Sequence, residues 1–110
     1  MRTVKKSRFL RLHFSEGDRY QGKPLYEAII ERAKRLGIAG ATVFRGLEGF
    51  GETAEIHRKH LLKHDEPIVV TIIDTAENLE RLIPEVEAMM DSGLIAISEV
   101  EAIRIEQPVL

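Results

Sequence analysis

Two stretches of this sequence contain residues that could do chemistry, one rich in glycine and one rich in histidine. The first, residues 46–51, holds three glycines and Phe50. Glycine permits positive φ angles and lets the backbone approach a ligand such as a phosphate closely. The order of these glycines differs from the dinucleotide-binding pattern, in which G-x-G-x-x-G joins a strand to a helix. The stretch therefore predicts either a ligand-binding turn or a simple bulge between a strand and a loop.

The histidine-rich stretch could bind a metal ion. His57, His60 and His64 are spaced i, i+3 and i+7, so they would share one face of a helix. The pair His60 and His64 has the i, i+4 spacing that can chelate a divalent metal ion. The cationic residues around these histidines would repel such an ion, so a solvated basic surface is the competing interpretation.

The same stretch could instead receive an anion or an acidic protein partner. His57, Arg58, Lys59 and Lys63 form a cationic group, whose charge would grow as the histidine protonates below pH about 6.5. Most charge runs are only solvated surface, and that alternative stays open. Residues 52–66, which contain this group, are predicted to be either a mobile loop or a short helix.

Composition limits the classes of function. The 110 residues are enough for one domain, and 44% hydrophobic with 31% charged residues is typical of a globular chain. A net charge of -2 argues against nucleic-acid binding, which needs many clustered cations. No recognisable pairing of a nucleophile with a base is present, so we expect a protein that is not an enzyme.

The absence of cysteine and the character of the N-terminus bear on location. Without cysteine the chain can form neither disulfides nor thiolate metal sites, which suits a cytoplasmic protein. Residues 1–6 carry three cations and are expected to form a charged arm. No apolar stretch long enough for a signal peptide or a membrane span follows them, so no membrane insertion is expected.

The first half of the chain shows a strand, a helix and a second strand. In residues 8–14, alternating apolar residues predict a strand with Leu10, Leu12 and Phe14 on one side. Residues 15–23 favour turns, and Pro24 suits the first position of a helix, which Gly37 would end. Residues 41–47 predict the second strand.

The second half repeats this order as a strand, a helix and a strand. Residues 68–73 are nearly all apolar, which is typical of a central strand. Asp74 and Glu77 have the spacing of a capping box, and an apolar stripe from Leu79 to Met90 predicts a helix. Pro84 lies inside that helix and predicts a kink or a division into two parts. The last strand is expected within residues 95–105.

This order predicts an α+β ferredoxin-like βαββαβ sandwich, an antiparallel four-stranded sheet with two helices on one face. A chain of 110 residues has no further element to cover the other face of the sheet. We therefore expect copies of the chain to associate through it.

Local sequence patterns resemble those of the PII nitrogen-signalling proteins. In that family a Gly-x-Thr-Val strand runs into Gly-Phe-Gly at the base of a long loop, as Thr42 and Val43 are followed here by Gly49, Phe50 and Gly51. The chain is more similar still to a PII-like family named domain of unknown function 190. The similar stretches are residues 40–51, 56–57, 67–74 and 92–105.

The resemblance implies a homotrimer that binds a small-molecule ligand in clefts between subunits. By this similarity Thr42, Gly49, Phe50 and Gly51 would line the cleft. Residues 52–66 would form a mobile loop that responds to the ligand and engages a protein partner, such as a membrane transporter or an enzyme. In PII proteins the ligands are adenine nucleotides, so AMP, ADP or an anionic metabolite is the expected ligand.

One departure from the PII pattern argues against ATP. PII proteins carry a Gly-Asp-Gly-Lys turn before the last strand, where this chain has residues 96–99, ending in Glu99. A carboxylate in place of a phosphate-binding lysine would repel a triphosphate. Two other functions remain as alternatives: a metal-binding trimer resembling the divalent-cation-tolerance proteins, through His57, His60 and His64, and a passive interaction module.

Overall fold

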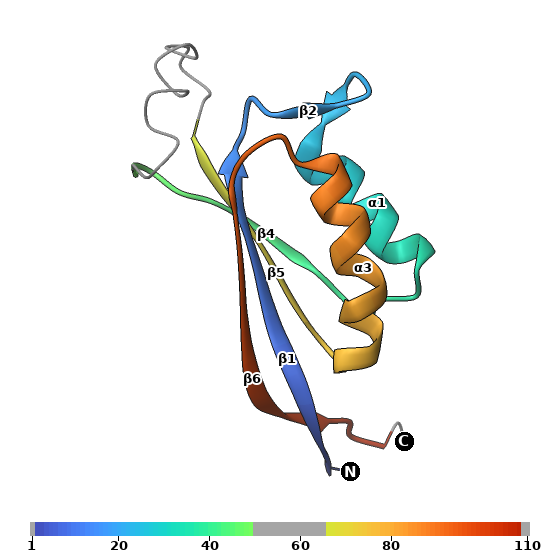
Figure 1. The fold of residues 1–110 in the computed structure, drawn as a ribbon. Coiled ribbons are helices and arrows are strands. Elements are labelled where there is room, and N and C mark those ends of the chain that lie inside the picture. The colour runs from blue at the N-terminus through green and yellow to red at the C-terminus, as the bar shows by residue number, and fades with distance from the viewer. Residues whose placement is uncertain (1, 50–65, 109–110) are drawn as a thin grey trace.

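The structure is a computed structural model that describes residues 2–49 and 66–108 of the chain. Two helices lie on one face of a four-stranded antiparallel sheet with strand order β4-β5-β1-β6 (Figure 1). Along the chain the elements are β1 (Arg2–Ser15), β2 (Arg19–Tyr20), β3 (Lys23–Pro24), α1 (Leu25–Arg35), β4 (Thr42–Arg45), β5 (Pro67–Asp74), α3 (Ala76–Met89) and β6 (Leu94–Ile105). Apart from the small β2–β3 hairpin, this is the predicted ferredoxin-like βαββαβ arrangement.

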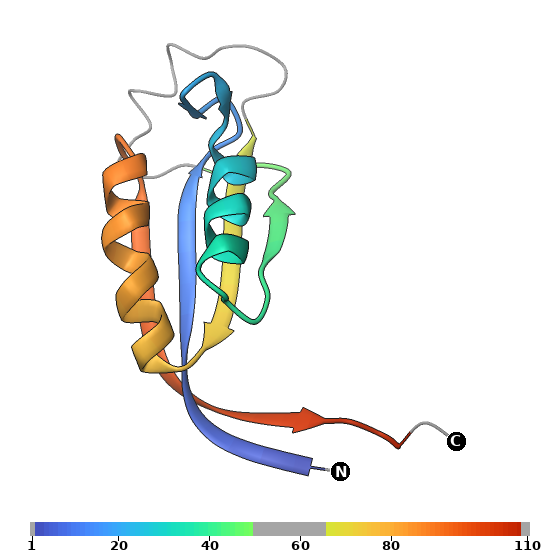
Figure 2. The ribbon, with the colours of Figure 1, turned by 90° about the vertical axis from the view of Figure 1, so that its right-hand side faces the viewer.

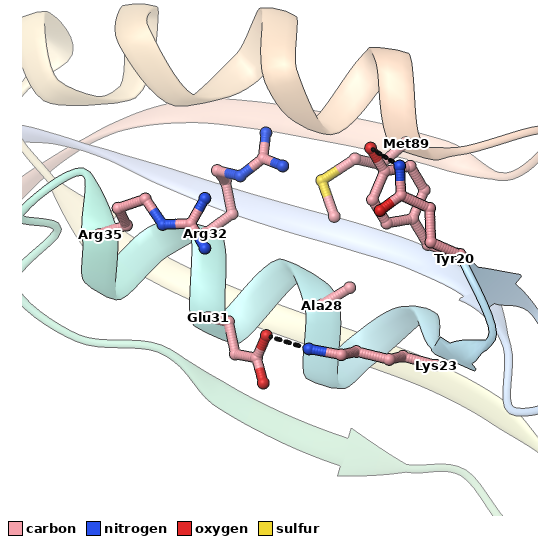
Figure 3. Close-up of a pocket in the computed structure, with 8 residues that line it drawn as sticks. Tyr20, Lys23, Ala28, Glu31, Arg32, Arg35 and Met89 are labelled. Carbon is pink, nitrogen blue, oxygen red and sulfur yellow. Dashed lines mark hydrogen bonds and ion pairs between the residues drawn. The ribbon is translucent and has the colours of Figure 1, made fainter.

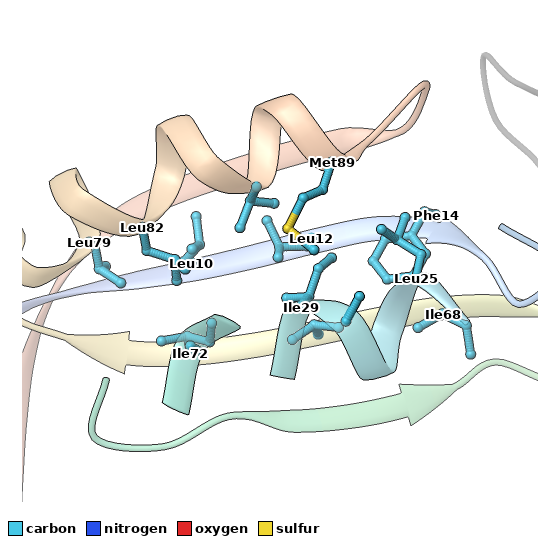
Figure 4. Packing of buried hydrophobic residues seen from close by; sticks show 14 residues of the cluster. Leu10, Leu12, Phe14, Leu25, Ile29, Ile68, Ile72, Leu79, Leu82 and Met89 are labelled. Atoms are coloured by element: carbon cyan, nitrogen blue, oxygen red, sulfur yellow. The ribbon is translucent and has the colours of Figure 1, made fainter. Parts of the chain in front are cut away.

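The core lies between the sheet and the helices (Figure 4). Leu10 and Leu12 on β1 are fully buried, as their alternation with exposed residues predicted. Each has a buried register partner on β5, because paired residues of antiparallel strands point to the same face. These partners are Ile72 and Val70. Helix α3 closes the core with a stripe of buried residues, namely Leu79, Leu82, Val86 and Met89.

Strand β1 is longer than predicted and includes residues 2–6, which were expected to form a charged arm. Its first half pairs with the second half of β6, from Arg2 opposite Ile105 to Ser7 opposite Val100. The cationic residues misled the prediction, because β5 pairs with β1 only from Arg8 onward, and the unpaired border of residues 2–6 accepts charged side chains. Residues 2–6 of the expected charged arm therefore belong to strand β1.

The ends of the helices follow local rules, with one correction. Gly37, with φ of 77°, ends α1 as predicted. Its N–H donates to the Lys34 carbonyl, and the next N–H donates to the Ala33 carbonyl, which is the Schellman pattern. The expected capping box from Asp74 to Glu77 is wrong. The N-cap of α3 is Thr75, whose hydroxyl oxygen accepts the Asn78 N–H at 3.1 Å.

Helix α3 continues without division through Pro84. The proline is exposed, and its neighbours Leu82 and Val86 are fully buried. Packing of the apolar stripe against the sheet holds the helix together although proline removes one backbone hydrogen bond. The predicted division into two parts is therefore wrong.

A short hairpin fills the region where the sequence predicted only turns. Gln21 and Gly22 have φ of 50° and 80°, the two positive values that a two-residue type I′ turn requires. The turn joins β2 to β3 and places Pro24 directly before α1. The helix thus begins at Leu25, one position after the proline that the sequence predicted as its first residue.

Candidate ligand site at the end of strand β4

Strand β4 forms one edge of the sheet and carries Thr42, the first predicted site residue. Thr42 pairs with Thr71 of β5, and Phe44 pairs with Val69. Because side chains alternate along a strand, Thr42 and Phe44 lie on the face opposite the helices. Phe44 is 55% exposed, which is unusual for a phenylalanine in a sheet. Thr42 therefore lies on an open, partly apolar surface at a sheet edge.

The chain after β4 is held close to the start of β5. The Gly46 N–H donates to the Pro67 carbonyl at 2.7 Å. A Cβ at Gly46 would lie 2.7 Å from Pro67 Cγ, whereas one at Gly49 would lie 3.5 Å from the same atom. Close backbone approach thus requires glycine at Gly46, a residue that the prediction passed over in favour of Gly49. Gly49 nevertheless lies beside Pro67, so both glycines belong to one turn.

Two charged residues at this end of the sheet were missed by sequence reasoning. The Arg45 guanidinium donates a hydrogen bond to Glu16 Oε2, joining the end of β4 to the residue after β1. The Arg45 side chain is 59% exposed and the Glu16 side chain only 14%. Glu16 Oε1 is buried and has no hydrogen-bond partner within residues 2–49 and 66–108. Arg45 is thus an accessible cation beside the glycine turn.

Asp74 fixes the segment that leads into β4. Its carboxylate accepts the Ala39 N–H at 2.9 Å, the Thr75 N–H at 2.7 Å and the Asn78 side-chain amide at 2.9 Å. Burial alone would raise the pKa of Asp74, but these three hydrogen bonds together outweigh it and lower the pKa below 3.8. The charged carboxylate therefore ties the α1–β4 connection to the start of α3, and with it the position of Thr42.

The open face of the sheet is apolar over much of its area. Phe44, Ile73 and Leu94 are 55%, 47% and 59% exposed. His13 lies on the same face, and its Nε2 is buried without a hydrogen-bond partner in the described residues. Burial, with a smaller contribution from the Arg11 charge, lowers the pKa of His13 below 6.5. A neutral imidazole among apolar side chains suits a surface that another molecule covers.

The position that the sequence predicted for Glu99 requires correction. Residues 96–99 lie inside β6, and the chain turns earlier, around Gly93. Glu99 is the register partner of Arg8 in the middle of the ladder. It does not occupy a phosphate-binding turn, so the argument against ATP that rested on its position there falls away.

A separate pocket of about 160 Å³ opens on the helix side of the molecule (Figure 3). Its lining residues are Tyr20, Gln21, Lys23, Ala28, Glu31, Arg32, Arg35 and Met89. Lys23 pairs with Glu31 at 2.8 Å, and Arg32 pairs with Glu85 at 2.7 Å. The pocket contains none of the predicted site residues, and most of its charges are already neutralised by neighbours.

The other predicted site residues lie outside the described residues. They are Phe50, Gly51, His57, Arg58, Lys59, His60, Lys63 and His64. Within the described ranges, no group of three or more metal-ligating side chains is present. Among the helices described, none has the length and apolar character needed to cross a membrane.

Comparison of the sequence with known proteins shows the family to which the chain belongs. A family model described as "DUF190, Uncharacterized ACR" matches residues 7–102. The UPF0166 protein of Aquifex aeolicus is 44% identical over 105 residues, which cover 94% of this chain and 98% of the relative. The chain belongs to the DUF190 family. A UPF0166 protein of Methanocaldococcus jannaschii is 33% identical to this DUF190 protein over 99 residues, covering 86% and 89% of the two chains.

Solved structures similar to the DUF190 protein share its fold. CPII from Thiomonas intermedia K12, a nitrogen regulatory PII-like protein, matches in its apo form with a TM-score of 0.61 and 20% identity, covering 96% of this chain and 100% of CPII. A form of CPII bound to ADP, AMP and bicarbonate matches with a TM-score of 0.64 and 14% identity, covering 91% and 98%. The DUF190 protein therefore has the PII-like fold, as its sequence predicted.

Proposed function

We propose that this DUF190 protein is a trimeric regulatory protein that binds an adenine nucleotide, AMP or ADP, or a small anionic metabolite between subunits. The proposed cleft of one subunit contains Thr42, Arg45 and the glycine-rich residues 46–51. Arg45 supplies the cation that an anionic ligand needs. The protein works by binding and is not an enzyme.

The observation that carries the proposal is the exposed apolar face of the sheet next to a strand edge that ends in a cation and a glycine turn. A monomer would leave Phe44, Ile73 and Leu94 in water, which costs about 25 cal/mol for each Å² of apolar surface left unburied. Covering this face with neighbouring copies puts the end of β4 at a subunit boundary. The binding of ADP, AMP and bicarbonate by CPII supports the choice of ligand class.

Arg45 and Glu16 make the binding step specific. In the structure the guanidinium is occupied by the Glu16 carboxylate. An anionic ligand replaces this carboxylate at Arg45, so the ligand must offer a phosphate or carboxylate of comparable charge. Residues 52–66, which follow these glycines in the sequence, then present the signal to a protein partner.

Calorimetric titration of the protein with ADP, AMP and bicarbonate tests the proposal. Arg45→Ala should weaken the binding of ADP about tenfold or more, because a charge-assisted hydrogen bond is lost. Glu16→Gln should strengthen it, because the competing carboxylate is gone. Arg35→Ala on α1 is the matched control, since this exposed arginine lies in the helix-side pocket. Equal affinities of wild type and Arg45→Ala would remove Arg45 from the site.

A metal-binding function is the second candidate, carried by the spacing of His57, His60 and His64. The same titration with zinc or copper ions distinguishes the two functions. Binding of metal without nucleotide binding, and its loss in a His60→Ala, His64→Ala double variant, would favour the metal function over the nucleotide function.

A further inference from the structure

A hairpin that the βαββαβ arrangement does not require forms one wall of the helix-side pocket (Figure 3). Strands β2 and β3 pair with each other and lie outside the four-stranded sheet, before helix α1 in Figure 2. The hairpin contributes Tyr20, Gln21 and Lys23 to the lining, and helices α1 and α3 contribute the rest. The pocket of about 160 Å³ is therefore completed by an element additional to the basic fold.

Helix α1 forms the floor of this pocket. Its lining residues share one face of the helix because they are spaced i, i+3, i+4 and i+7, namely Ala28, Glu31, Arg32 and Arg35. From Ala28 to Arg35 the helix rises about 10 Å, at 1.5 Å for each residue. The alanine side chain is small, so the floor is low at that end. The pocket is thus a short trough along the helix.

The charges in the pocket leave one cation without a partner. Lys23 Nζ lies 2.8 Å from Glu31 Oε2, and Arg32 Nη1 lies 2.7 Å from Glu85 Oε1. Arg35 is exposed, and no carboxylate in residues 2–49 or 66–108 lies within ion-pairing distance of its guanidinium. The pocket therefore has an excess of one positive charge, at Arg35.

The other end of the pocket is apolar. Met89 of α3 is 4% exposed, and Tyr20 of the hairpin packs against the hydrophobic core. Met89 and Tyr20 lie at one end of the pocket, and the guanidinium of Arg35 lies at the other (Figure 3). A ligand that matches both ends needs an anionic group joined to an apolar body.

We propose that this pocket binds a small monocarboxylate with an apolar or aromatic body. The carboxylate accepts hydrogen bonds from Arg35, and the body lies beside Tyr20 and Met89. Arginine suits this ligand because its guanidinium donates two parallel hydrogen bonds to a carboxylate. A second negative charge on the ligand would face Glu31 without a free cation to balance it, so a monoanion fits better than a dianion.

The size of the pocket limits the ligand and separates this site from the proposed nucleotide site. A cavity of about 150 Å³ accommodates a molecule the size of benzene. An adenine nucleotide is much larger than that, so the binding of ADP remains independent of Arg35. None of the lining residues belongs to β4 or to the glycine turn. The pocket is therefore a second binding site, beyond the proposed function.

Titration of the ¹⁵N-labelled wild type with benzoate, followed by amide chemical shifts, tests the inference. Shifts in residues 20–23 and 28–35 should saturate at concentrations on the order of 1–10 mM, the affinity range of so small a ligand. Benzamide keeps the ring without the charge, and acetate keeps the charge without the ring. Each should bind about tenfold more weakly or less, since each satisfies only one end of the pocket.

A matched pair of variants locates the charge that is needed. Arg35→Gln should weaken the binding of benzoate about tenfold or more, because the guanidinium is lost. Lys34→Gln removes the same charge from an exposed neighbour that does not line the pocket, and it should change the affinity by less than about twofold. Circular dichroism checks that both variants fold.

Three results would overturn the inference. They are equal losses of affinity in Arg35→Gln and Lys34→Gln, binding of benzamide as tight as that of benzoate, and no saturable shift in residues 20–35 of the wild type. The last two need no variant. Each of them leaves the nucleotide proposal standing, because the titration with ADP is a separate measurement at the end of β4.

Discussion

The carboxylate of Asp74 is expected to stabilise both the fold and the position of the candidate site. Asp74 is 9% exposed and accepts three hydrogen bonds, from Ala39, Thr75 and Asn78. A hydrogen bond to a charged group contributes about 1.5–3 kcal/mol, and the Asn78 amide can turn toward water when the carboxylate is gone. Asp74→Ala should therefore lower the free energy of unfolding by about 2–4 kcal/mol. Most of this loss comes from the backbone N–H groups of Ala39 and Thr75, which lose their hydrogen-bond acceptor.

Urea unfolding followed by circular dichroism measures this loss at pH 7. The same measurement repeated at lower pH gives the pH dependence of the loss. The pKa of Asp74 is below its ordinary value of 3.8 in the folded state. The unfolded chain therefore binds the proton more readily, and the stabilisation present above pH 3.8 is lost as the pH falls through the folded pKa. The difference between wild type and Asp74→Asn should accordingly shrink below pH about 3.8.

An exposed aspartate at the end of α3, Asp91, provides the control. Asp91→Ala should change the free energy of unfolding by less than about 0.5 kcal/mol, as surface substitutions usually do. If Asp74→Ala were as stable as Asp91→Ala, the hydrogen bonds to Ala39 and Thr75 would not hold the α1–β4 connection. The argument that Asp74 positions Thr42 would then fail.

Three further predictions concern Gly93, the pair Gly46 and Gly49, and His13. Gly93→Ala should lower the free energy of unfolding by about 2 kcal/mol or more in thermal melts, because Gly93 has φ of 128° and a Cβ there would lie 2.3 Å from the His13 carbonyl oxygen. Gly46→Ala should destabilise the protein more than Gly49→Ala, since only the first places a Cβ within 3 Å of Pro67; equal melting temperatures would contradict this. Burial lowers the pKa of His13 in the folded state, so the folded protein resists protonation of this imidazole and should lose stability as the pH falls below 6.5. In urea titrations from pH 8 to 5, the free energy of unfolding of His13→Phe should therefore change less with pH than that of the wild type.

The sequence alone determined the core of this protein. The apolar residues of β1 alternate with polar ones, which predicts a strand with one buried face, and Leu10 and Leu12 are indeed buried. The apolar run of β5 predicts a central strand, and the side chains on its helix-facing side are buried as well. Pro24 and Gly37 marked the ends of α1 because their backbone preferences act locally. Core burial and helix ends depend on neighbours within a few positions, which is why a single sequence was enough.

Tertiary structure decided the contacts between residues far apart in the chain. Arg45 and Glu16 are 29 positions apart, and Ala39 and Asp74 are 35 apart, so no local pattern pairs them. The pairing of the first half of β1 with the second half of β6 depends in the same way on residues near both ends of the chain, where Arg2 lies opposite Ile105. A charged strand and a charged arm look alike in sequence, and only the hydrogen-bonding partner that the fold brings alongside makes one of them a strand.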